Sequence, residues 1–185
     1  MGTDKALVEV AGVPMVQWVA ATLERTGLDV VTVGGPHRVP GYENIADPPG
    51  LGGPLAGLAG ALEKSADAAI VLVAVDQPLV RQTTLERLLA VDGHDAVVPM
   101  DAGHPQVTCA LYRPSCLPVL RQIETAIPNV SIRDLLARAA VRYIEPAEWM
   151  DWGEDGRSWR SIDTPVDLAA IESDLVADKS REPGE

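Results

Sequence analysis

Aromatic and basic residues are scarce in this 185-residue sequence. Phenylalanine is absent, and aromatic residues make up only 4% of the chain. A hydrophobic core must therefore come from Val, Leu, Ile and Ala, a composition typical of a buried β-sheet flanked by helices. Lys and Arg number 15 against 27 Asp and Glu, which gives a formal net charge of −12. This balance argues against a nucleic-acid-binding protein and against binding to an anionic membrane surface. A few local cations or a metal ion still permit a small anionic ligand.

Cysteine, histidine and long apolar runs are also scarce. Cys109 and Cys116 are the only cysteines, their spacing is not that of a C-x-x-C motif, and the three histidines are too scattered to complete a zinc site. We therefore expect two ordinary thiols in a reducing compartment. No apolar run reaches the roughly 18 residues of a membrane span, and the first residues lack the apolar core of a secretion signal. The sequence predicts a cytoplasmic protein with no membrane contact.

Short apolar runs alternate with stretches of helical spacing along the chain. We expect strands at residues 7–10, 29–33, 68–76, 95–100, 107–112 and 141–144. We expect helices at residues 14–26, 54–64, 83–89, 114–124 and 131–140 and from 164 onward, with a segment that is mostly loop at 37–53. This alternation predicts an α/β fold, a Rossmann-like three-layer sandwich with a mainly parallel sheet. We expect one domain over residues 1–176 and a disordered polar tail at 177–185.

An acidic residue, Asp76, follows the apolar run AAIVLVAV at residues 68–75. Such a run predicts a strand buried on both faces of a parallel sheet, and folds of this class bind ligands outside the carboxyl ends of their strands. A carboxylate there is costly to desolvate unless it is paired, hydrogen-bonded or bound to a metal. Two interpretations stay open. Asp76 is a Mg²⁺ ligand, because Mg²⁺ prefers oxygen ligands, or it caps the next helix, for which Thr83 and Thr84 are also candidates.

A glycine-rich run, GLGGPLAG at residues 50–57, precedes the helix expected from Pro54. Glycines allow the backbone to approach a ligand closely, and a helix N-terminus favours anions. The spacing matches neither a Walker A motif nor G-x-G-x-x-G. A phosphate-binding loop and tight packing of small residues against the sheet therefore both remain possible interpretations.

Three shorter signals complete the set. Lys5 either neutralises a triphosphate or, as composition alone favours, forms a solvated pair with Asp4 near a terminus. Asp163 in SIDTP either places a carboxylate near the site or, as we favour, caps the helix that follows. Residues 104–106, His-Pro-Gln, either line a substrate pocket or form a plain turn between two strands.

Taken in order, these motifs resemble those of the molybdenum cofactor guanylyltransferases, a MobA-like family of α/β nucleotidyltransferases. The similar segments are MGTDKAL at 1–7, AGVPM at 11–15, ADPPGLGGPLAG at 46–57, AVDQP at 74–78, GHPQVTCALYR at 103–113 and IDTPVDL at 162–168. The resemblance covers most of the chain, and its specificity lies in the order of the motifs.

The first of these segments is similar to only the back half of the family's phosphate-binding signature. The resemblance therefore implies that a first, central strand and the L-A-G-G turn after it are missing ahead of Met1. We expect a truncated gene model, in which an internal methionine has been taken as the start, rather than a truncated enzyme.

The resemblance also implies roles for single residues. Lys5 would contact the nucleotide phosphates, Asp47 the guanosine, and Asp76 would bind Mg²⁺ and approach the nucleotide, so that Lys5 and Asp76 are the implied catalytic residues. The residues implied along the base are Gly53, Pro54 and Leu55. The residues implied for contact with the pterin are His104, Gln106 and Arg113.

The reaction implied by the resemblance is transfer of GMP from GTP to the phosphate of the molybdopterin cofactor, with release of pyrophosphate. Molybdoenzymes or their chaperones are the expected protein partners. Two alternatives remain. One is the same fold acting with CTP or on another phosphorylated acceptor, and the other is a non-catalytic module that binds the pterin or a partner protein.

Overall fold

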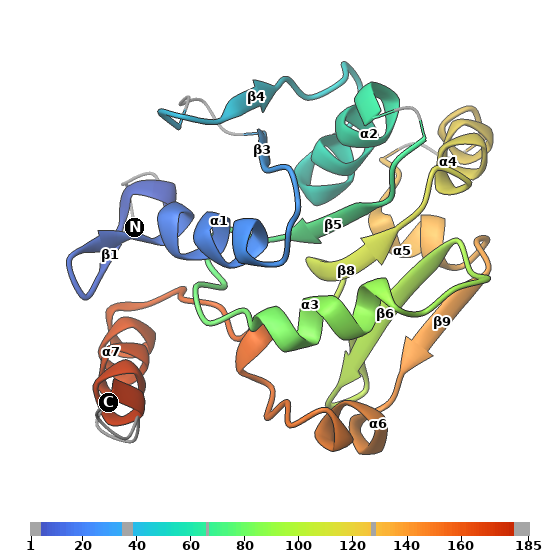
Figure 1. The fold of residues 1–185 in the computed structure, drawn as a ribbon. Helices are drawn as coiled ribbons and strands as arrows, with labels where there is room; N and C mark the ends of the chain where they lie inside the picture. Colours follow the sequence, from blue (N-terminus) through green and yellow to red (C-terminus); the bar gives the residue numbers. More distant parts are fainter. Residues whose placement is uncertain (1–4, 35–38, 66, 127–128, 180–185) are drawn as a thin grey trace.

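The computed structural model describes residues 5–34, 39–65, 67–126 and 129–179 (Figure 1). A five-stranded sheet lies at its centre, with helices on both faces. Its strands are β5 (Ile70–Val73), β8 (Cys109–Tyr112), β6 (Ala96–Asp101), β7 (His104–Pro105) and β9 (Val141–Ile144). They follow the order β5-β8-β6-β7, and β9 also pairs with β6. The predicted Rossmann-like α/β sandwich is confirmed.

Strand directions in this sheet are mixed. β9 runs parallel to β6, whereas β8 runs antiparallel to both β5 and β6. The sheet thus departs from the expected mainly parallel arrangement at β8 and at the two-residue β7, which pairs antiparallel with β6. Because β5 and β6 both oppose β8, they are parallel to each other. Their carboxyl ends therefore lie at the same edge of the sheet, the edge at which ligands bind in open α/β sheets.

Alternating side chains of the sheet pack into two separate hydrophobic clusters. Leu72, Val98 and Ala110 pack with one set of helices, and Val97 and Leu111 pack with the other. The helices of the first set are α2 (Gly53–Ser65), α4 (Cys116–Glu124) and α5 (Ile132–Leu136). Those of the second set are α1 (Met15–Arg25), α3 (Gln82–Leu89) and α6 (Pro146–Asp151). This period-two division is what a sheet covered on both faces requires.

Two smaller sheets accompany the central one. β3 (Val31–Val33) pairs in parallel with β4 (Glu43–Ile45), and β1 (Glu9–Val10) forms a hairpin with β2 (Val13–Pro14). β4 lies within the segment predicted to be mostly loop, and no strand was predicted at these three residues. The cause is that Glu-Asn-Ile has neither the apolar run nor the alternation by which a strand is identified.

Helix ends follow local sequence signals in most cases. α1 ends before Gly27, whose φ of +80° requires a residue without a Cβ. Ser131 and Asp134 form the expected capping box at α5. The predicted threonine cap of α3 was wrong, because Arg81 is the N-cap and the hydroxyl of Thr84 instead donates to Glu154.

The last helix, α7 (Pro165–Lys179), continues past residue 176, where the domain was expected to end. Residues 180–185 of the expected tail lie outside the described part of the chain. Among the described residues, no helix is both long enough and apolar enough to cross a bilayer.

Replacing Gly57 by alanine is expected to destabilise the protein, although alanine favours helices. A Cβ at this position in α2 would lie 2.6 Å from Val33 Cγ2 and 3.0 Å from Val33 Cβ, so α2 and β3 must separate. Overpacking of this kind typically costs about 1–3 kcal/mol. Urea unfolding measures the change. Gly52→Ala, where a Cβ meets nothing within 4 Å, is the matched control, and equal stability of the two variants would contradict the packing argument.

Candidate active site

Three charged side chains that are remote in sequence meet beyond the carboxyl end of β5. Lys5 Nζ donates to Asp76 Oδ2 at 3.0 Å and to Asp163 Oδ1 at 2.5 Å. These partners lie 71 and 158 residues from Lys5 along the chain. The Asp76 side chain is 20% exposed and the Lys5 side chain 39% exposed, so the cluster is accessible from solvent. One ammonium group thus holds two carboxylates together.

Backbone and amide hydrogen bonds fix the two acidic segments to each other. The carbonyl of Asp76 accepts from the Ile162 amide at 2.9 Å. The buried side chain of Gln77 donates through Nε2 to Thr108 Oγ1 and to the carbonyl of Trp159, each at 3.3 Å. The turn after β5 is therefore tied to the segment that carries Asp163.

Asp163 does not serve as the helix cap that its sequence context predicts. Thr164 and Asp167 fulfil that role reciprocally: the Asp167 amide donates to Thr164 Oγ1 at 3.2 Å, and the Thr164 amide donates to Asp167 Oδ2 at 2.8 Å. The Asp163 carboxylate instead accepts from Lys5 and from Ser161 Oγ. The signal that distinguishes the two roles is the Thr-Pro-x-Asp sequence itself, which forms a cap without help from Asp163.

The contacts within the cluster shift the pKa values of Lys5 and Asp163 in the directions that keep both side chains charged. The hydrogen bonds to Asp163 and Asp76 raise the pKa of Lys5. The hydrogen bond from Lys5, with that from Ser161, lowers the pKa of Asp163. The interaction of Lys5 with Asp163 is therefore fully present above the ordinary pKa of an aspartate and is lost as the pH falls through the lowered pKa.

Lys5→Met is expected to move the titration midpoint of Asp163 upward, because the donor that lowers its pKa is removed. Carboxyl carbon chemical shifts followed by NMR between pH 2 and pH 7 report this midpoint. Asp134, whose pKa is lowered by hydrogen bonds from Ser131, is an internal control that should not move. An unchanged Asp163 midpoint in the variant would show that the ion pair does not form in solution.

The glycine-rich segment lies near the end of β3. Gly34 has a φ of +68°, and a Cβ there would lie 3.5 Å from Asp47 Oδ1, so the exposed Asp47 carboxylate is set against the backbone of the strand end. Gly53 and Pro54 are exposed at the start of α2, and with Asp47 they line one large cavity. Leu55 is different, since its side chain is 1% exposed within the hydrophobic core. Only its backbone is available to a ligand.

His104 and Gln106 lie at the same edge of the sheet as Asp76. His104 pairs with Asp101 at the carboxyl end of β6. Gln106 lines a polar pocket of about 450 Å³ together with Asp101, Asp155, Gly156, Arg157, Trp159, Arg160 and Ser161. Since Ser161 also donates to Asp163, this pocket adjoins the charged cluster.

Arg113 is not brought to the cluster. It follows β8 at Tyr112, whose register partner is Ile70, the first residue of β5, whereas Asp76 follows the last. Arg113 thus lies at the opposite end of the sheet. Its guanidinium donates to the carbonyls of Val91 and His94, where it closes the connection before β6. Both cysteines are buried, and burial raises the pKa of Cys109 to about 12 and that of Cys116 to about 11.

The sequence of this chain is similar to a known protein family and to several of its members. Residues 1–143 match the model of the MobA-like NTP transferase domain. A probable molybdenum cofactor guanylyltransferase of Pelotomaculum thermopropionicum is 27% identical over 187 residues, which cover 98% of this chain and 89% of that protein. A molybdenum cofactor guanylyltransferase of Pseudomonas putida is 32% identical over 155 residues, which cover 80% of each.

Solved structures agree in fold. The crystal structure of the molybdopterin-guanine dinucleotide biosynthesis protein A from Archaeoglobus fulgidus superposes with a TM-score of 0.77 at 26% identity, covering 95% of this chain and 92% of that one. A cytidylyltransferase from Thermus thermophilus, at a TM-score of 0.69 and 18% identity over 93% of this chain and 94% of that one, shares the fold. The chain belongs to the MobA-like NTP transferase family and is a nucleotidyltransferase.

Proposed function

We propose that this nucleotidyltransferase transfers GMP from GTP to molybdopterin and releases pyrophosphate. The observation that carries the proposal is the meeting of Lys5, Asp76 and Asp163 at the carboxyl end of β5. One cation and two carboxylates at this edge are suited to a nucleoside triphosphate and its metal ion. The names of the relatives, molybdenum cofactor guanylyltransferase, support guanosine as the nucleoside and the molybdenum cofactor as the acceptor.

The two carboxylates fit a magnesium ion. Mg²⁺ is usually held by one or two protein carboxylates, and waters and substrate phosphates complete its shell. Within the described residues, no group of three or more His, Cys, Asp or Glu side chains is arranged to hold a metal ion. Asp76 and Asp163 both accept from the ammonium of Lys5, which supports a site where the two carboxylates bind a cation. Mg²⁺ bound there would offset the negative charge of the triphosphate.

The reaction needs no covalent intermediate on the protein. An oxygen of the acceptor phosphate attacks the α-phosphorus of GTP in line, the new P–O bond forms, and the bond to the β-phosphate oxygen breaks as pyrophosphate leaves. In this proposal, Lys5 donates to phosphate oxygens whose charge increases in this step. The hydrogen bonds that tie Asp76 to the segment before Asp163 hold both carboxylates in position, so little reorganisation accompanies the reaction.

Substrate contacts divide between two sides of the cluster. We assign the guanosine to the side of Asp47, Gly53 and Pro54, where a carboxylate and exposed backbone groups are available. We assign the acceptor to the polar pocket that contains Gln106, with His104 at its rim. Arg113 is left out of this assignment because it lies at the opposite end of the sheet.

A pyrophosphate-release assay tests the proposal with protein purified from its native host. Molybdopterin and GTP should together give pyrophosphate, GTP without the acceptor should not, and chelation of divalent metal should abolish release until Mg²⁺ is restored. Release with CTP in place of GTP would assign the protein to cytidylyl transfer. No release with either nucleotide, and no thermal stabilisation by saturating GTP and Mg²⁺, would leave a non-catalytic module.

A further inference from the structure

A single buried side-chain amide, that of Gln77, joins three segments next to the charged cluster. Its Oε1 accepts at 3.3 Å from the amide of Ala74, which also donates to the carbonyl of Thr108 at 2.9 Å. Its Nε2 donates at 3.3 Å to Thr108 Oγ1, just before β8, and at 3.3 Å to the carbonyl of Trp159. The Gln77 side chain is 4% exposed, so water has little access to replace these partners.

These contacts require an amide and fix its orientation. The Ala74 N–H needs an acceptor, whereas the Trp159 carbonyl needs a donor. An amide turned by 180° would set its oxygen against that carbonyl, and a glutamate would do the same. A methionine of similar shape would leave Thr108 Oγ1 and the Trp159 carbonyl without this donor. Glutamine is the side chain of this length that carries a neutral donor and an acceptor together.

The segments that Gln77 joins form two walls of the polar pocket to which we assign the acceptor. Gln106 lines that pocket from the loop before β8, and Trp159 and Ser161 line it from the segment that leads to the charged cluster. Gln77 directly follows Asp76 in the chain. Its one amide therefore connects both walls of the pocket to the turn that carries this carboxylate.

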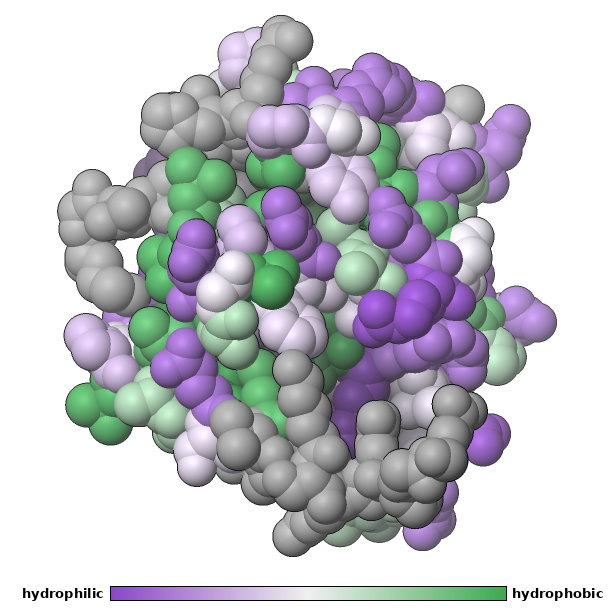
Figure 2. All heavy atoms as spheres, turned by 60° about the vertical axis from the view of Figure 1, so that its left-hand side comes forward, coloured by the Kyte–Doolittle hydropathy of each residue, from purple (hydrophilic) through white to green (hydrophobic). Residues whose placement is uncertain are grey.

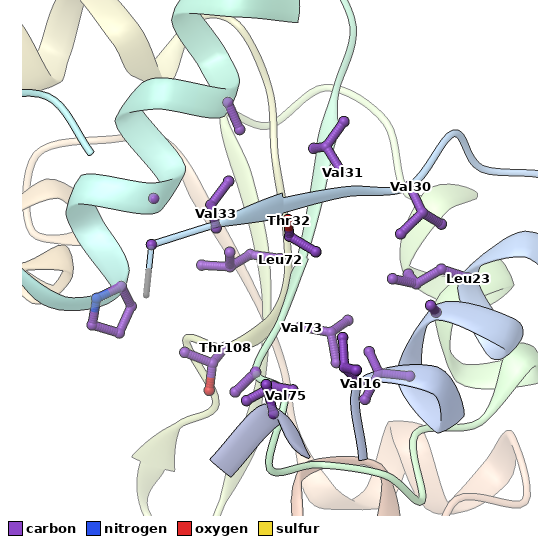
Figure 3. A pocket seen from close by; sticks show the side chains of 18 of the residues that line it. Val16, Leu23, Val30, Val31, Thr32, Val33, Leu72, Val73, Val75 and Thr108 are labelled. Carbon is purple, nitrogen blue, oxygen red and sulfur yellow. The ribbon is translucent and has the colours of Figure 1, made fainter. Parts of the chain in front are cut away.

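An aliphatic cavity of about 540 Å³ lies on the other side of the contact between Gln77 and Thr108. Figure 3 shows Thr108 beside Val75 at one end of this cavity, away from Val30. Such a lining is a poor environment for an unpaired hydroxyl, so the hydrogen bond from Gln77 matters more there. On the side of the molecule turned forward in Figure 2, by contrast, polar side chains reach the surface between hydrophobic ones. Polar side chains at such a surface pair with water and tolerate replacement.

We propose that Gln77 is a positioning residue for nucleotidyl transfer: its amide holds both walls of the acceptor pocket against the turn of Asp76 and so aligns the acceptor with the carboxylates. This inference rests on the proposed function. Misplacement of a reacting group by about 1 Å can cost roughly 10²-fold in rate. The side-chain partners of Gln77 among the described residues do not include Asp47 or Gly53, to which we assign the guanosine. Loss of the amide should therefore affect the acceptor more than the nucleotide.

Gln77→Met should lower the rate of pyrophosphate release by about 10–100-fold and raise the KM for molybdopterin, because the two pocket walls lose their common donor. Thermal stabilisation by GTP and Mg²⁺ without the acceptor should stay at the parental value. The matched control is Gln122→Met, at an exposed position of α4, which should equal the parent in every measurement. A parental rate and KM in Gln77→Met would overturn the inference.

Two substitutions at Thr108 keep the inference testable if Gln77→Met does not fold. Thr108→Val keeps the shape of the side chain but removes the hydroxyl that accepts from Gln77, so the KM for molybdopterin should rise. Thr108→Ser keeps the hydroxyl, and its KM should stay within a few fold of the parental value. Equal KM values for Thr108→Val and Thr108→Ser would contradict a role for this hydrogen bond.

Hydrogen exchange tests the link without any substrate. The Ile162 amide donates to the carbonyl of Asp76 at 2.9 Å, so its exchange reports the contact between the two segments. This amide should exchange at least tenfold faster in Gln77→Met, whereas amides paired between β6 and β8 should keep their protection. Unchanged exchange at Ile162 would show that Gln77 does not hold the segments together. A parent protein that releases no pyrophosphate would instead reject the guanylyltransferase, so the two failures are distinguishable.

Discussion

Asp76→Asn is expected to lower the rate of nucleotidyl transfer by about 10²–10³-fold while the protein stays folded. The asparagine removes the negative charge that we assign to Mg²⁺, and loss of one such electrostatic contact costs about 2.7–4 kcal/mol in the transition state. The fold should persist because the backbone carbonyl of residue 76 still accepts from Ile162, and an amide oxygen still accepts from Lys5. Steady-state pyrophosphate release gives the rate, and circular dichroism and thermal unfolding report the fold.

The control for this variant is Asp151→Asn, which removes the same charge at an exposed position of α6. It should retain the rate of the parent protein. A rate for Asp76→Asn within a few fold of the control would contradict the proposed role of Asp76 as a Mg²⁺ ligand. A Mg²⁺ titration adds a second readout: the variant should need a higher concentration of the ion, whereas a merely structural role would leave that requirement unchanged.

Glu154→Ala is expected to lower the free energy of unfolding by about 3 kcal/mol or more. Glu154 is 4% exposed, and its Oε1 accepts from the amides of Asp155, Gly156 and Ser158. Its Oε2 accepts from the hydroxyls of Thr84 and Ser158. Alanine leaves all five donors, which are buried or partly buried, without this acceptor, and that loss is large against a typical total stability of about 5–15 kcal/mol.

Chemical denaturation of matched variants measures this effect. Glu124→Ala, at an exposed position of α4, should change stability by less than about 0.5 kcal/mol. Glu154→Gln should be intermediate, because an amide retains one acceptor oxygen but sets its own donors against the two hydroxyls. Stability of Glu154→Ala equal to that of Glu124→Ala would show that water replaces the carboxylate at little cost.

Glu154 also bears on the site through the chain that follows it. Its hydrogen bonds fix the turn that leads to Trp159, whose Nε1 donates to Asp101 Oδ2 at 2.8 Å and whose carbonyl accepts from Gln77. The same segment continues to Ser161 and Asp163. Glu154, which takes no part in the proposed reaction, thus helps to hold Asp163, which does.

The predicted and observed elements differ in an instructive way. The helix expected at 54–64 is α2, and the strand expected at 141–144 has the same bounds as β9. Both were predicted because a run of small or apolar residues can be recognised within a short window of sequence. The strand β4 and the helix α6 were missed, since neither has such a run. The antiparallel direction of β8 was also missed, because periodicity identifies a strand without giving its direction.

The sequence by itself determined the α/β layering, most helix positions, and the place of Asp76 after an apolar strand, since each depends on residues within one turn or one strand. The order of its motifs added the resemblance to a family. Only the tertiary structure decided that Asp163 binds Lys5 rather than capping α7, and that Arg113 lies at the far end of the sheet. Those facts depend on contacts between residues far apart in the chain, and a local sequence pattern does not predict such contacts.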